Sequence, residues 1–221
     1  MTTPVQAGGV FITDFDGTMT EQDFYRIAQQ QLTPPETPDY WHEYLAGRLT
    51  HFEALQRIFQ HIRADEETVM QAARQMELDP HAGTAIRQLQ SVGWEVVVAS
   101  AGCSWYIDRL LAAQGVTVTV HANPGSLDPS RGLYMQAPTT VPYYSPATGI
   151  DKTAVVQNAV ATHLRVAFAG DGRPDLPASL LVPPVYRFAR GWLANALAEA
   201  GESFRPFTQW SEIADILVKG M

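Results

Sequence analysis

Two pairs of aspartates have the spacing expected of a site that holds a divalent cation. Asp14 and Asp16 come directly after a short apolar segment, and Asp171 and Asp175 follow another. Residues two apart on an extended chain share a face, so we expect Asp14 and Asp16 to converge, with Gly17 allowing the backbone to turn away. Crowded carboxylates repel one another or take up protons unless a hard cation that prefers oxygen lies among them. The pattern therefore predicts a Mg²⁺ site.

Two further polar residues are placed where they could join this acidic cluster. Ser100 follows the apolar segment 95–99, and Lys152 begins a predicted helix that Asp151 can cap. A nucleophile, a neighbouring acid or base, a metal ion and positive donors are the parts needed to transfer a phosphoryl group. Each of these residues alone would be an ordinary turn, cap or surface residue. Their common position at strand ends favours a catalytic site.

The elements that must position these residues alternate along the chain. Short apolar segments rich in β-branched residues are separated by segments of helical period, which predicts a parallel sheet covered by helices on both faces. The expected strands are 10–12, 95–99, 116–120 and 165–169. Ligands bind at the carboxyl ends of the strands in such sheets. We therefore expect an α/β fold with a Rossmann-like, doubly wound parallel sheet.

A helical insertion is predicted between the first two strands, because the roughly eighty residues there exceed what a crossover connection needs. Thr50 and Glu53 form a capping box ahead of apolar residues at helical spacing, and Asp65 can cap the next helix. We predict four short cap helices, at 24–32, at 40–46, at 50–62 and from 66 to about 76. The expected domains are a helical cap domain at 20–79 and a core domain at 1–19 and 80–221. A long loop, with room for a hairpin, is expected at 124–146.

Charge and cysteine content limit the classes of partner and compartment. The chain has 15 Lys and Arg against 23 Asp and Glu, a formal net charge of −8, which opposes binding to nucleic acid or to an anionic membrane surface. No apolar segment approaches the roughly 20 residues that span a bilayer, and residues 1–9 lack the pattern of a targeting signal. The single cysteine, Cys103, fits a reducing compartment. We expect a cytoplasmic monomer or homodimer that binds a small molecule.

Other nucleophiles are disfavoured by their surroundings. Cys103 and Arg109 have the Cys-x5-Arg spacing of cysteine phosphatases, but bulky residues lie between them where a phosphate loop needs glycines. That segment predicts instead a helix capped by Ser104. Ser100 lies outside any Gly-x-Ser-x-Gly pattern, which disfavours a serine esterase.

The histidines and aromatic residues of the insertion have structural interpretations. His42, His51 and His61 have no partner at metal-ligand spacing, and we expect them on the cap surface or on a helix face. The aromatic residues are expected to pack within the cap, with one or two of them lining a substrate pocket.

The ordered motifs resemble those of a known family. The haloacid dehalogenase superfamily has four motifs in this order, and the chain is similar at DFDGT (14–18), Ser100, Lys152 and GDGRPD (170–175). The helical insertion resembles the C1-type cap of the phosphoserine-phosphatase-like subgroup. The segments FAR (188–190) and FRPF (204–207) resemble the tail of the methionine-salvage phosphatase branch.

The resemblance implies a reaction in two steps. Asp14 would accept the phosphoryl group as an aspartyl phosphate, and Asp16 would protonate the leaving alcohol and then activate the hydrolytic water. Halide-displacing members of the superfamily lack the second aspartate, so Asp16 favours hydrolysis of a phosphate ester.

The resemblance also implies the ligand sets. The expected Mg²⁺ ligands are Asp14, Asp16 through its backbone carbonyl, Asp171 and Asp175, although Asp175 would alternatively orient Lys152. The expected phosphate-binding residues are Ser100, Ala101 and Lys152.

The chain departs from the family pattern at Arg173 and Pro174, where related phosphatases place a small residue and Asn. Pro174 removes a backbone donor, and Arg173 either contacts the phosphate or points to solvent. This departure keeps open a second class of function, a catalytically silent phosphometabolite-binding protein. Asp23 lies where amine-binding members carry Glu, so it is a candidate for substrate specificity.

The expected function is Mg²⁺-dependent hydrolysis of a small-molecule phosphate monoester. The resemblance places 2-hydroxy-3-keto-5-methylthiopentenyl-1-phosphate first among the substrates. Phosphoserine and phosphocholine-like esters are the alternatives.

Overall fold

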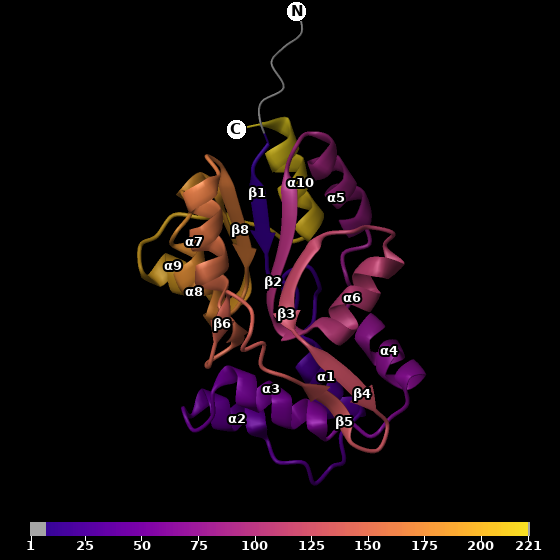
Figure 1. The fold of residues 1–221 in the computed structure, drawn as a ribbon. Coiled ribbons are helices and arrows are strands. Elements are labelled where there is room, and N and C mark those ends of the chain that lie inside the picture. The colour runs from indigo at the N-terminus through magenta and orange to yellow at the C-terminus, as the bar shows by residue number, and fades with distance from the viewer. Residues whose placement is uncertain (1–7, 221) are drawn as a thin grey trace, which may run out of the picture.

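A six-stranded parallel sheet forms the centre of the protein (Figure 1). The computed structural model describes residues 8–220, so residues 1–7 of the predicted core segment, and Met221, lie outside the described residues. The strand order is β10-β9-β8-β1-β2-β3, and every neighbouring pair is parallel. The strands are β1 (Val10–Thr13), β2 (Glu95–Cys103), β3 (Thr119–Asn123), β8 (Val166–Gly170), β9 (Arg187–Ala189) and β10 (Arg205–Pro206).

Helices cover both faces of this sheet, because successive side chains of a strand point to opposite sides. Phe11 belongs to the apolar cluster formed with α5 (Ala82–Ser91), α6 (Ser104–Ala113) and α10 (Trp210–Lys219). Val10 and Ile12 belong to the cluster formed with α7 (Lys152–Thr162) and α8 (Leu176–Ser179). The predicted doubly wound α/β fold is confirmed.

The strand order reverses at the centre of the sheet, between β1 and β8. β1 pairs with β2 on one side and with β8 on the other, so the chain winds outward from β1 both ways. The backbone amide of Asp14, just past β1, donates to the carbonyl of Ala169 at 2.9 Å. Ligands bind at such a switch point, beyond the carboxyl ends of the strands.

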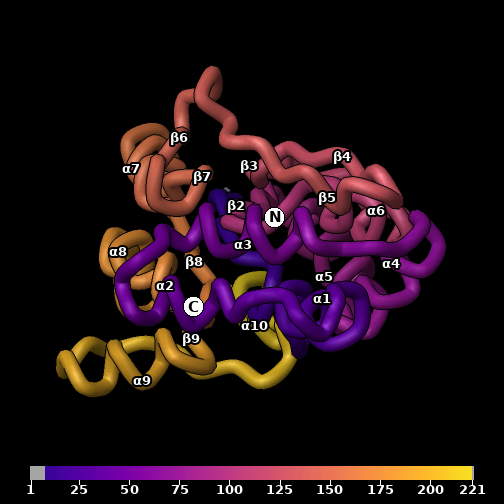
Figure 2. The backbone as a smooth tube through the Cα atoms, turned by 90° about the horizontal axis from the view of Figure 1, so that it is seen from below, coloured from indigo at the N-terminus to yellow at the C-terminus, as the bar shows by residue number. Residues whose placement is uncertain are grey.

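Four helices follow β1 and lie beyond the carboxyl end of the sheet (Figures 1 and 2). They are α1 (Phe24–Gln31), α2 (Tyr40–Leu45), α3 (His51–Gln60) and α4 (Glu66–Arg74). The predicted capping box is present, since Glu53 accepts from the Thr50 amide at 2.8 Å and donates its own amide to Thr50 Oγ1 at 3.2 Å. Asp65 caps α4 as predicted, at 2.8 Å from the Thr68 amide. We propose residues 20–79 as the cap domain and residues 1–19 and 80–221 as the core domain.

A segment of the core that contains a β-hairpin forms hydrogen bonds with α3 of the cap. Within the segment 124–146, β4 (Gly125–Asp128) and β5 (Gly132–Met135) pair as an antiparallel hairpin, and a second short pair is formed by β6 (Tyr144–Ser145) and β7 (Gly149–Ile150). Gln56 Nε2 donates to the carbonyl of Met135 at 2.8 Å, and the Phe52 amide donates to that of Ala147 at 2.9 Å. Both ends of this region therefore hold α3.

The boundaries of β2 and β3 differ from the sequence prediction. β3 begins at Thr119, three residues later than predicted, because its ladder with β2 starts at the pair Val97–Thr119. β2 continues to Cys103 through an irregularity after Ala99, so Ser100 lies within the strand and does not follow it.

The start of α6 also differs. The helix begins at Ser104, so the predicted cap residue is the first helical residue and Cys103 is the N-cap. The Cys103 amide donates to Tyr106 Oη at 3.2 Å, which supplies a partner for an amide at the start of the helix.

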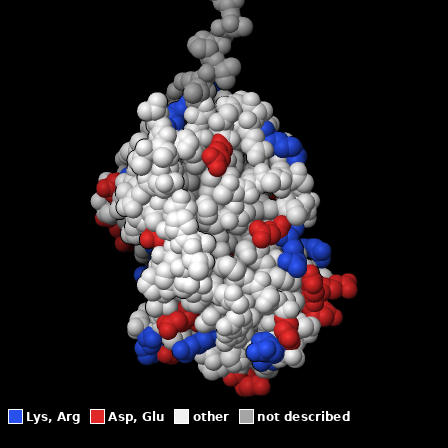
Figure 3. Space-filling view, viewed as in Figure 1, with Lys and Arg blue, Asp and Glu red and all other residues white. Residues whose placement is uncertain are grey.

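The remaining elements are two single-turn segments and one helix. They are η1 (Arg173–Asp175), η2 (Pro184–Tyr186) and α9 (Gly191–Glu199). On the face shown in Figure 3, basic and acidic side chains are interspersed and the basic ones do not gather into a patch. None of the helices in residues 8–220 has the length and apolar character that crossing a membrane requires.

Candidate active site

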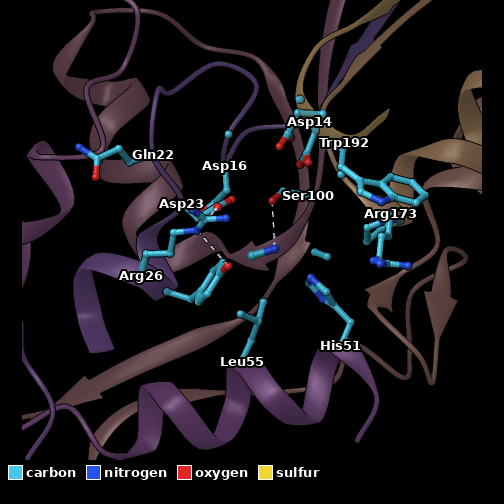
Figure 4. A pocket seen from close by; sticks show the side chains of 18 of the residues that line it. Asp14, Asp16, Gln22, Asp23, Arg26, His51, Leu55, Ser100, Arg173 and Trp192 are labelled. Carbon is cyan, nitrogen blue, oxygen red and sulfur yellow. Dashed lines mark hydrogen bonds and ion pairs between the residues drawn. The ribbon is translucent and has the colours of Figure 1, made fainter. Parts of the chain in front are cut away.

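A pocket of about 720 Å³ lies between the carboxyl end of the sheet and the cap helices (Figure 4). Of the predicted site residues, the pocket is lined by Asp14, Asp16, Asp23, Ser100, Ala101, Lys152 and Asp171. Asp175 is fully buried and lies outside the lining. Residues that the sequence places up to 157 positions apart thus meet at one edge of the sheet, as predicted.

Lys152 is the centre of the buried charge network. It is only 3% exposed, and its Nζ lies 2.7 Å from Asp14 Oδ2 and 2.6 Å from Asp175 Oδ1. The predicted cap by Asp151, which accepts from the Ala154 amide at 3.0 Å, fixes Lys152 as the first residue of α7. Burial opposes the ammonium charge, but Asp14 and Asp175 outweigh it and raise the pKa of Lys152. The lysine is therefore a fixed positive charge beside Asp14.

Asp175 orients its neighbours. Besides Lys152, it accepts at Oδ2 from the backbone amides of Asp171 at 3.1 Å and Gly172 at 2.9 Å. A Cβ on Gly170 would lie 2.6 Å from the Asp175 carboxyl carbon, so only glycine leaves room for it there. Of the two roles open from sequence, orientation of Lys152 is the one for which the structure has a direct contact.

The acidic residues form a donor set suited to a hard cation. Oxygen atoms of Asp14, Asp171 and Asp175 lie within 4.8 Å of one another. Burial raises the pKa of Asp14 well above its usual range, and burial together with Asp175 raises that of Asp171 to about 7. Positive charge at this position would stabilise the ionised forms, and three carboxylates match the oxygen preference of Mg²⁺. The residues present therefore fit the metal.

Gly17 allows the loop after β1 to approach Asp171. Its φ is +70°, in the left-handed region, and a Cβ there would lie 2.5 Å from Asp171 Oδ2. Thr18 Oγ1 donates to Asp171 Oδ1 at 2.8 Å from the same loop. The predicted turn at Gly17 is thus confirmed, and it brings the two acidic motifs into contact.

Asp16 occupies a different part of the pocket from the Asp14 network. Its carboxylate accepts from the Phe24 amide at 3.1 Å and from Tyr106 Oη at 2.9 and 3.0 Å. Because β1 ends at Thr13, the rule for residues two apart on a strand does not apply to Asp14 and Asp16, and the two carboxylates have separate partners. Burial, with Asp23 adding to it, raises the pKa of Asp16 to about 7. A carboxyl of that pKa can both donate and accept a proton near neutral pH.

Tyr106 and Gly102 support Asp16, and sequence reasoning missed both. A Cβ on Gly102 would lie 2.2 Å from Tyr106 Oη and 2.7 Å from Asp16 Oδ2. The absence of a side chain at Gly102 therefore allows the tyrosine and the carboxylate to meet. Nothing in the helical spacing around Tyr106 distinguishes it from the apolar residues beside it.

Ser100 and Ala101 lie on β2 with their backbone held in place. Ser100 Oγ accepts from the Gly102 amide at 3.0 Å (Figure 4), and the Ala101 carbonyl accepts from Asn123 Nδ2 at 2.8 Å. Ser100 is only 1% exposed but lines the pocket. Its hydroxyl proton has no acceptor among residues 8–220, so it is available to an oxygen in the pocket.

Asp23 and Arg26 form an ion pair on the cap side. Arg26 Nε lies 3.1 Å from Asp23 Oδ2 and donates to Tyr25 Oη at 3.0 Å. Burial raises the pKa of Asp23, and Arg26 opposes that shift. A cationic substrate group would have to compete with Arg26 for this carboxylate.

Arg173 lies at the rim of the pocket. Its guanidinium carbon is 4.8 Å from the centre of the Trp192 ring, and both residues line the pocket (Figure 4). Pro174 lies in the η1 turn, where its missing amide proton breaks no helix. The structure thus adds a third possibility to the two weighed from sequence, an arginine stacked on an aromatic ring.

Two residues from the C-terminal third hold the loop that carries Asp14. Trp210 Nε1 donates to Thr13 Oγ1 at 2.9 Å, and Thr13 Oγ1 donates to the Asp14 carbonyl at 2.8 Å. Arg190 donates to the carbonyls of Gly17, at 2.7 Å, and Thr20. Arg190 was noted in the sequence only as part of the FAR segment, and its role in the site is visible only in the fold.

His51 lies on a helix face, as predicted, but that face lines the pocket. Cys103 is fully buried, and burial raises the pKa of its thiol to about 12. A thiol that stays protonated is a poor nucleophile, which agrees with the exclusion of a cysteine mechanism.

Comparison with known proteins gives the same assignment. The family profile of the haloacid dehalogenase-like hydrolases matches residues 11–179. The chain is 22% identical over 212 residues to a 2-hydroxy-3-keto-5-methylthiopentenyl-1-phosphate phosphatase of Brevibacillus brevis, covering 94% of each chain.

Solved structures share the fold. A phosphoserine phosphatase of T. onnurineus aligns with a TM-score of 0.65 and 16% identity, covering 100% of this chain and 99% of that one. A HAD family hydrolase of Salmonella enterica serovar Typhi aligns with a TM-score of 0.64 and 18% identity, and the match covers 84% of this chain and 63% of that longer chain. Since the family profile spans most of the chain, including all four motifs, the chain belongs to the haloacid dehalogenase-like hydrolases.

Proposed function

We propose that this hydrolase is a Mg²⁺-dependent phosphatase that cleaves a small-molecule phosphate monoester through an aspartyl phosphate on Asp14. The observation that carries the proposal is the Asp14–Lys152–Asp175 network beside Asp171, with Asp16 facing the same pocket from a separate position. This arrangement holds a nucleophile and an acid in one cavity without pairing them to each other.

In the first step, a carboxylate oxygen of Asp14 attacks phosphorus and the phosphorus–oxygen bond to the alcohol breaks. Asp14 is oriented for this by a hydrogen bond from the Phe15 amide at 2.7 Å and by an ion pair with Lys152 at 2.7 Å. Asp16 donates its proton to the departing oxygen, so the alcohol leaves neutral. The Ser100 hydroxyl and Lys152 bind the oxygens of the transferred phosphoryl group.

In the second step, Asp16 takes a proton from water as the water oxygen attacks the phosphorus of the aspartyl phosphate. The bond between phosphorus and the Asp14 oxygen breaks, which releases inorganic phosphate and restores the carboxylate. Tyr106 and the Phe24 amide keep Asp16 in place for both proton transfers.

Asp14, Asp171 and the Asp16 carbonyl are the proposed Mg²⁺ ligands, with Asp175 behind them orienting Lys152. When bound, Mg²⁺ would supply positive charge to the carboxylates and to the phosphoryl oxygens. The convergence of the Asp14 and Asp171 carboxylates, with that of Asp175 beside them, supports this choice of metal.

The proposed substrate is 2-hydroxy-3-keto-5-methylthiopentenyl-1-phosphate, supported by the curated relative that covers 94% of the chain. Phosphoserine and phosphocholine-like esters remain the alternative substrates. The phosphoserine alternative is supported by the shared fold of the T. onnurineus phosphoserine phosphatase. A cytoplasmic location and a monomeric or homodimeric state remain predictions from the sequence.

Hydrolysis of p-nitrophenyl phosphate with Mg²⁺ and with EDTA tests the reaction class. We expect release of phosphate that requires Mg²⁺ and is abolished by Asp14→Asn. Asp215→Asn, the same change at an exposed position of α10, should retain full activity. A panel of phosphorylated metabolites compared by kcat/KM would then identify the ester.

The alternative is a silent phosphometabolite-binding protein, which the unusual Arg173 and Pro174 favour. If the unaltered protein binds phosphate but releases none from any ester in the presence of Mg²⁺, the silent alternative is correct and the phosphatase proposal is wrong.

A further inference from the structure

The cap wall of the pocket is mostly apolar, with one polar group in it. On α3, His51, Leu55 and Phe59 are spaced four residues apart and all line the pocket, so they form one stripe along the helix. Trp41 and Tyr44 of α2 line the pocket beside them. Figure 4 shows the His51 ring beside Leu55, turned from α3 toward the cavity.

The His51 side chain is half-buried, and one of its two ring nitrogens, Nδ1, is buried and lacks a hydrogen-bond partner. Within residues 8–220, three buried side-chain polar atoms have no partner, Thr37 Oγ1, Asn123 Oδ1 and His51 Nδ1, and of these three residues only His51 lines the pocket. Nδ1 is closed to the pocket, so a ligand would pair with the other ring nitrogen, Nε2, which is not among these closed and unpaired atoms. Burial also lowers the pKa of His51 to about 3, so the ring is neutral.

The position of the ring is fixed by its surroundings. The centres of the Trp41 and Tyr44 rings lie 5.5 and 5.3 Å from that of His51, and both meet it edge to face. His51 is the first residue of α3, directly after the Thr50 capping box, and the following residue is held by Ala147. The imidazole is therefore oriented before any ligand enters.

The charged groups around the outer pocket already have partners. Asp23 pairs with Arg26, Arg173 stacks on Trp192, and Arg190 donates to backbone carbonyls and pairs with Glu21 at 3.3 Å. An ammonium on the substrate would have to compete with Arg26 for Asp23, whereas stacking on Trp192 leaves the N–H groups of Arg173 free to meet an anion. A neutral hydroxyl needs only a neutral donor or acceptor, which His51 supplies.

We propose that His51 is a specificity-determining residue that hydrogen-bonds a hydroxyl group on a partly apolar leaving group that carries no ammonium. The inference rests on the proposed phosphatase function and names the substrate class for that site. A hydroxyl can donate as well as accept, so it pairs with the imidazole in either tautomer. The aromatic and aliphatic wall around His51 would cover the apolar part of the same leaving group.

A cycle of two substrates and two proteins tests the proposal. The substrates are pentyl phosphate and 2-hydroxypentyl phosphate, which differ by one hydroxyl, and the proteins are the unaltered chain and His51→Phe, which keeps a ring against Trp41 and Tyr44. We expect the unaltered protein to favour the hydroxylated ester by about 3- to 10-fold in kcat/KM, as for one neutral hydrogen bond. His51→Phe should lose this preference, so that its kcat/KM values for the two esters become nearly equal.

Two controls separate the outcomes. His42→Phe, at an exposed position of α2 outside the pocket, should keep the preference. Binding of the same two esters to Asp14→Asn, with and without His51→Phe, should show the same selectivity by calorimetry without turnover. Hydrolysis of both esters with no preference for the hydroxyl would overturn the role of His51 and leave the phosphatase proposal intact. Selective binding of the hydroxylated ester without hydrolysis of either ester would overturn the phosphatase proposal and leave the role of His51 intact.

Discussion

Replacing Gly102 with alanine is expected to impair proton donation by Asp16 more than phosphate binding. The added Cβ would lie 2.2 Å from Tyr106 Oη and 2.7 Å from Asp16 Oδ2, whereas ordinary contacts begin at 3.4 Å. The hydroxyl must therefore move by at least 1.2 Å and the carboxylate by 0.7 Å, which breaks their 2.9 Å hydrogen bond or shifts both groups together. A displacement of about 1 Å at a catalytic group can cost about 100-fold in rate.

The loss should depend on the leaving group. For an alkyl phosphate, whose alcohol must be protonated, we expect Gly102→Ala to lower kcat/KM by about 100-fold, within the range of a general acid's contribution. For p-nitrophenyl phosphate the departing nitrophenolate needs no proton, so its kcat/KM, which reports steps up to phosphoryl transfer, should fall far less.

The assay is steady-state phosphate release from both esters by Gly102→Ala, Tyr106→Phe and the double variant. Removing the hydroxyl removes the closest clash, so Gly102→Ala should do less damage in the Tyr106→Phe background. Equal losses on both esters would refute the reasoning, because they would indicate that the Cβ acts through Ser100, whose Oγ it would approach to 3.1 Å.

Two further predictions concern stability. Lys152→Met leaves Asp14 and Asp175 buried without a cation, so the free energy of unfolding in denaturant should fall by about 3–5 kcal/mol at pH 8. The loss should be smaller at pH 5, where Asp14, whose pKa is raised by burial, can protonate, and an equal loss at both pH values would contradict this. The pKa of His51 is about 3 in the folded protein and about 6.5 in the unfolded chain. Below pH 6.5 only the unfolded imidazole binds a proton, so protonation of His51 there lowers the stability of the folded state. Between pH 7.5 and 5 the melting temperature of the unaltered protein should therefore drop more than that of His51→Phe, in which the other titrating groups are unchanged; parallel curves would argue against a buried neutral ring.

The sequence was most informative where a local rule decides the structure. The capping box at Thr50, the caps at Asp65 and Asp151 and the turn at Gly17 each depend on neighbours within a few residues, and all four are present. The position of the acidic motifs at strand ends followed from the topology of parallel sheets, which brings such ends to one edge.

Features set by tertiary contacts were not predictable from the same rules. The start of β3 depends on its register with β2, and the side chain of Asp16 is placed by Tyr106 from a distant helix. His51 has the spacing of an ordinary helix residue, and only the packing of α2 and α3 over the sheet turns it into part of a cavity wall. Such residues carry no periodic or motif signal, so their roles require the three-dimensional structure.

The hydrogen bond from Trp210 to Thr13 joins residues 197 positions apart, at the residue before Asp14, the proposed nucleophile. A ribosome that has just finished β1 must therefore add nearly two hundred residues before the anchor for Asp14 exists, a delay of about 10–40 s at about 5–20 residues per second. Throughout that time this hydrogen bond cannot hold the loop that carries Asp14 in the nascent chain. The C-terminal helix must therefore be complete before the loop that carries Asp14 gains this anchor, and a chain cut short before Trp210 would carry the motif without it.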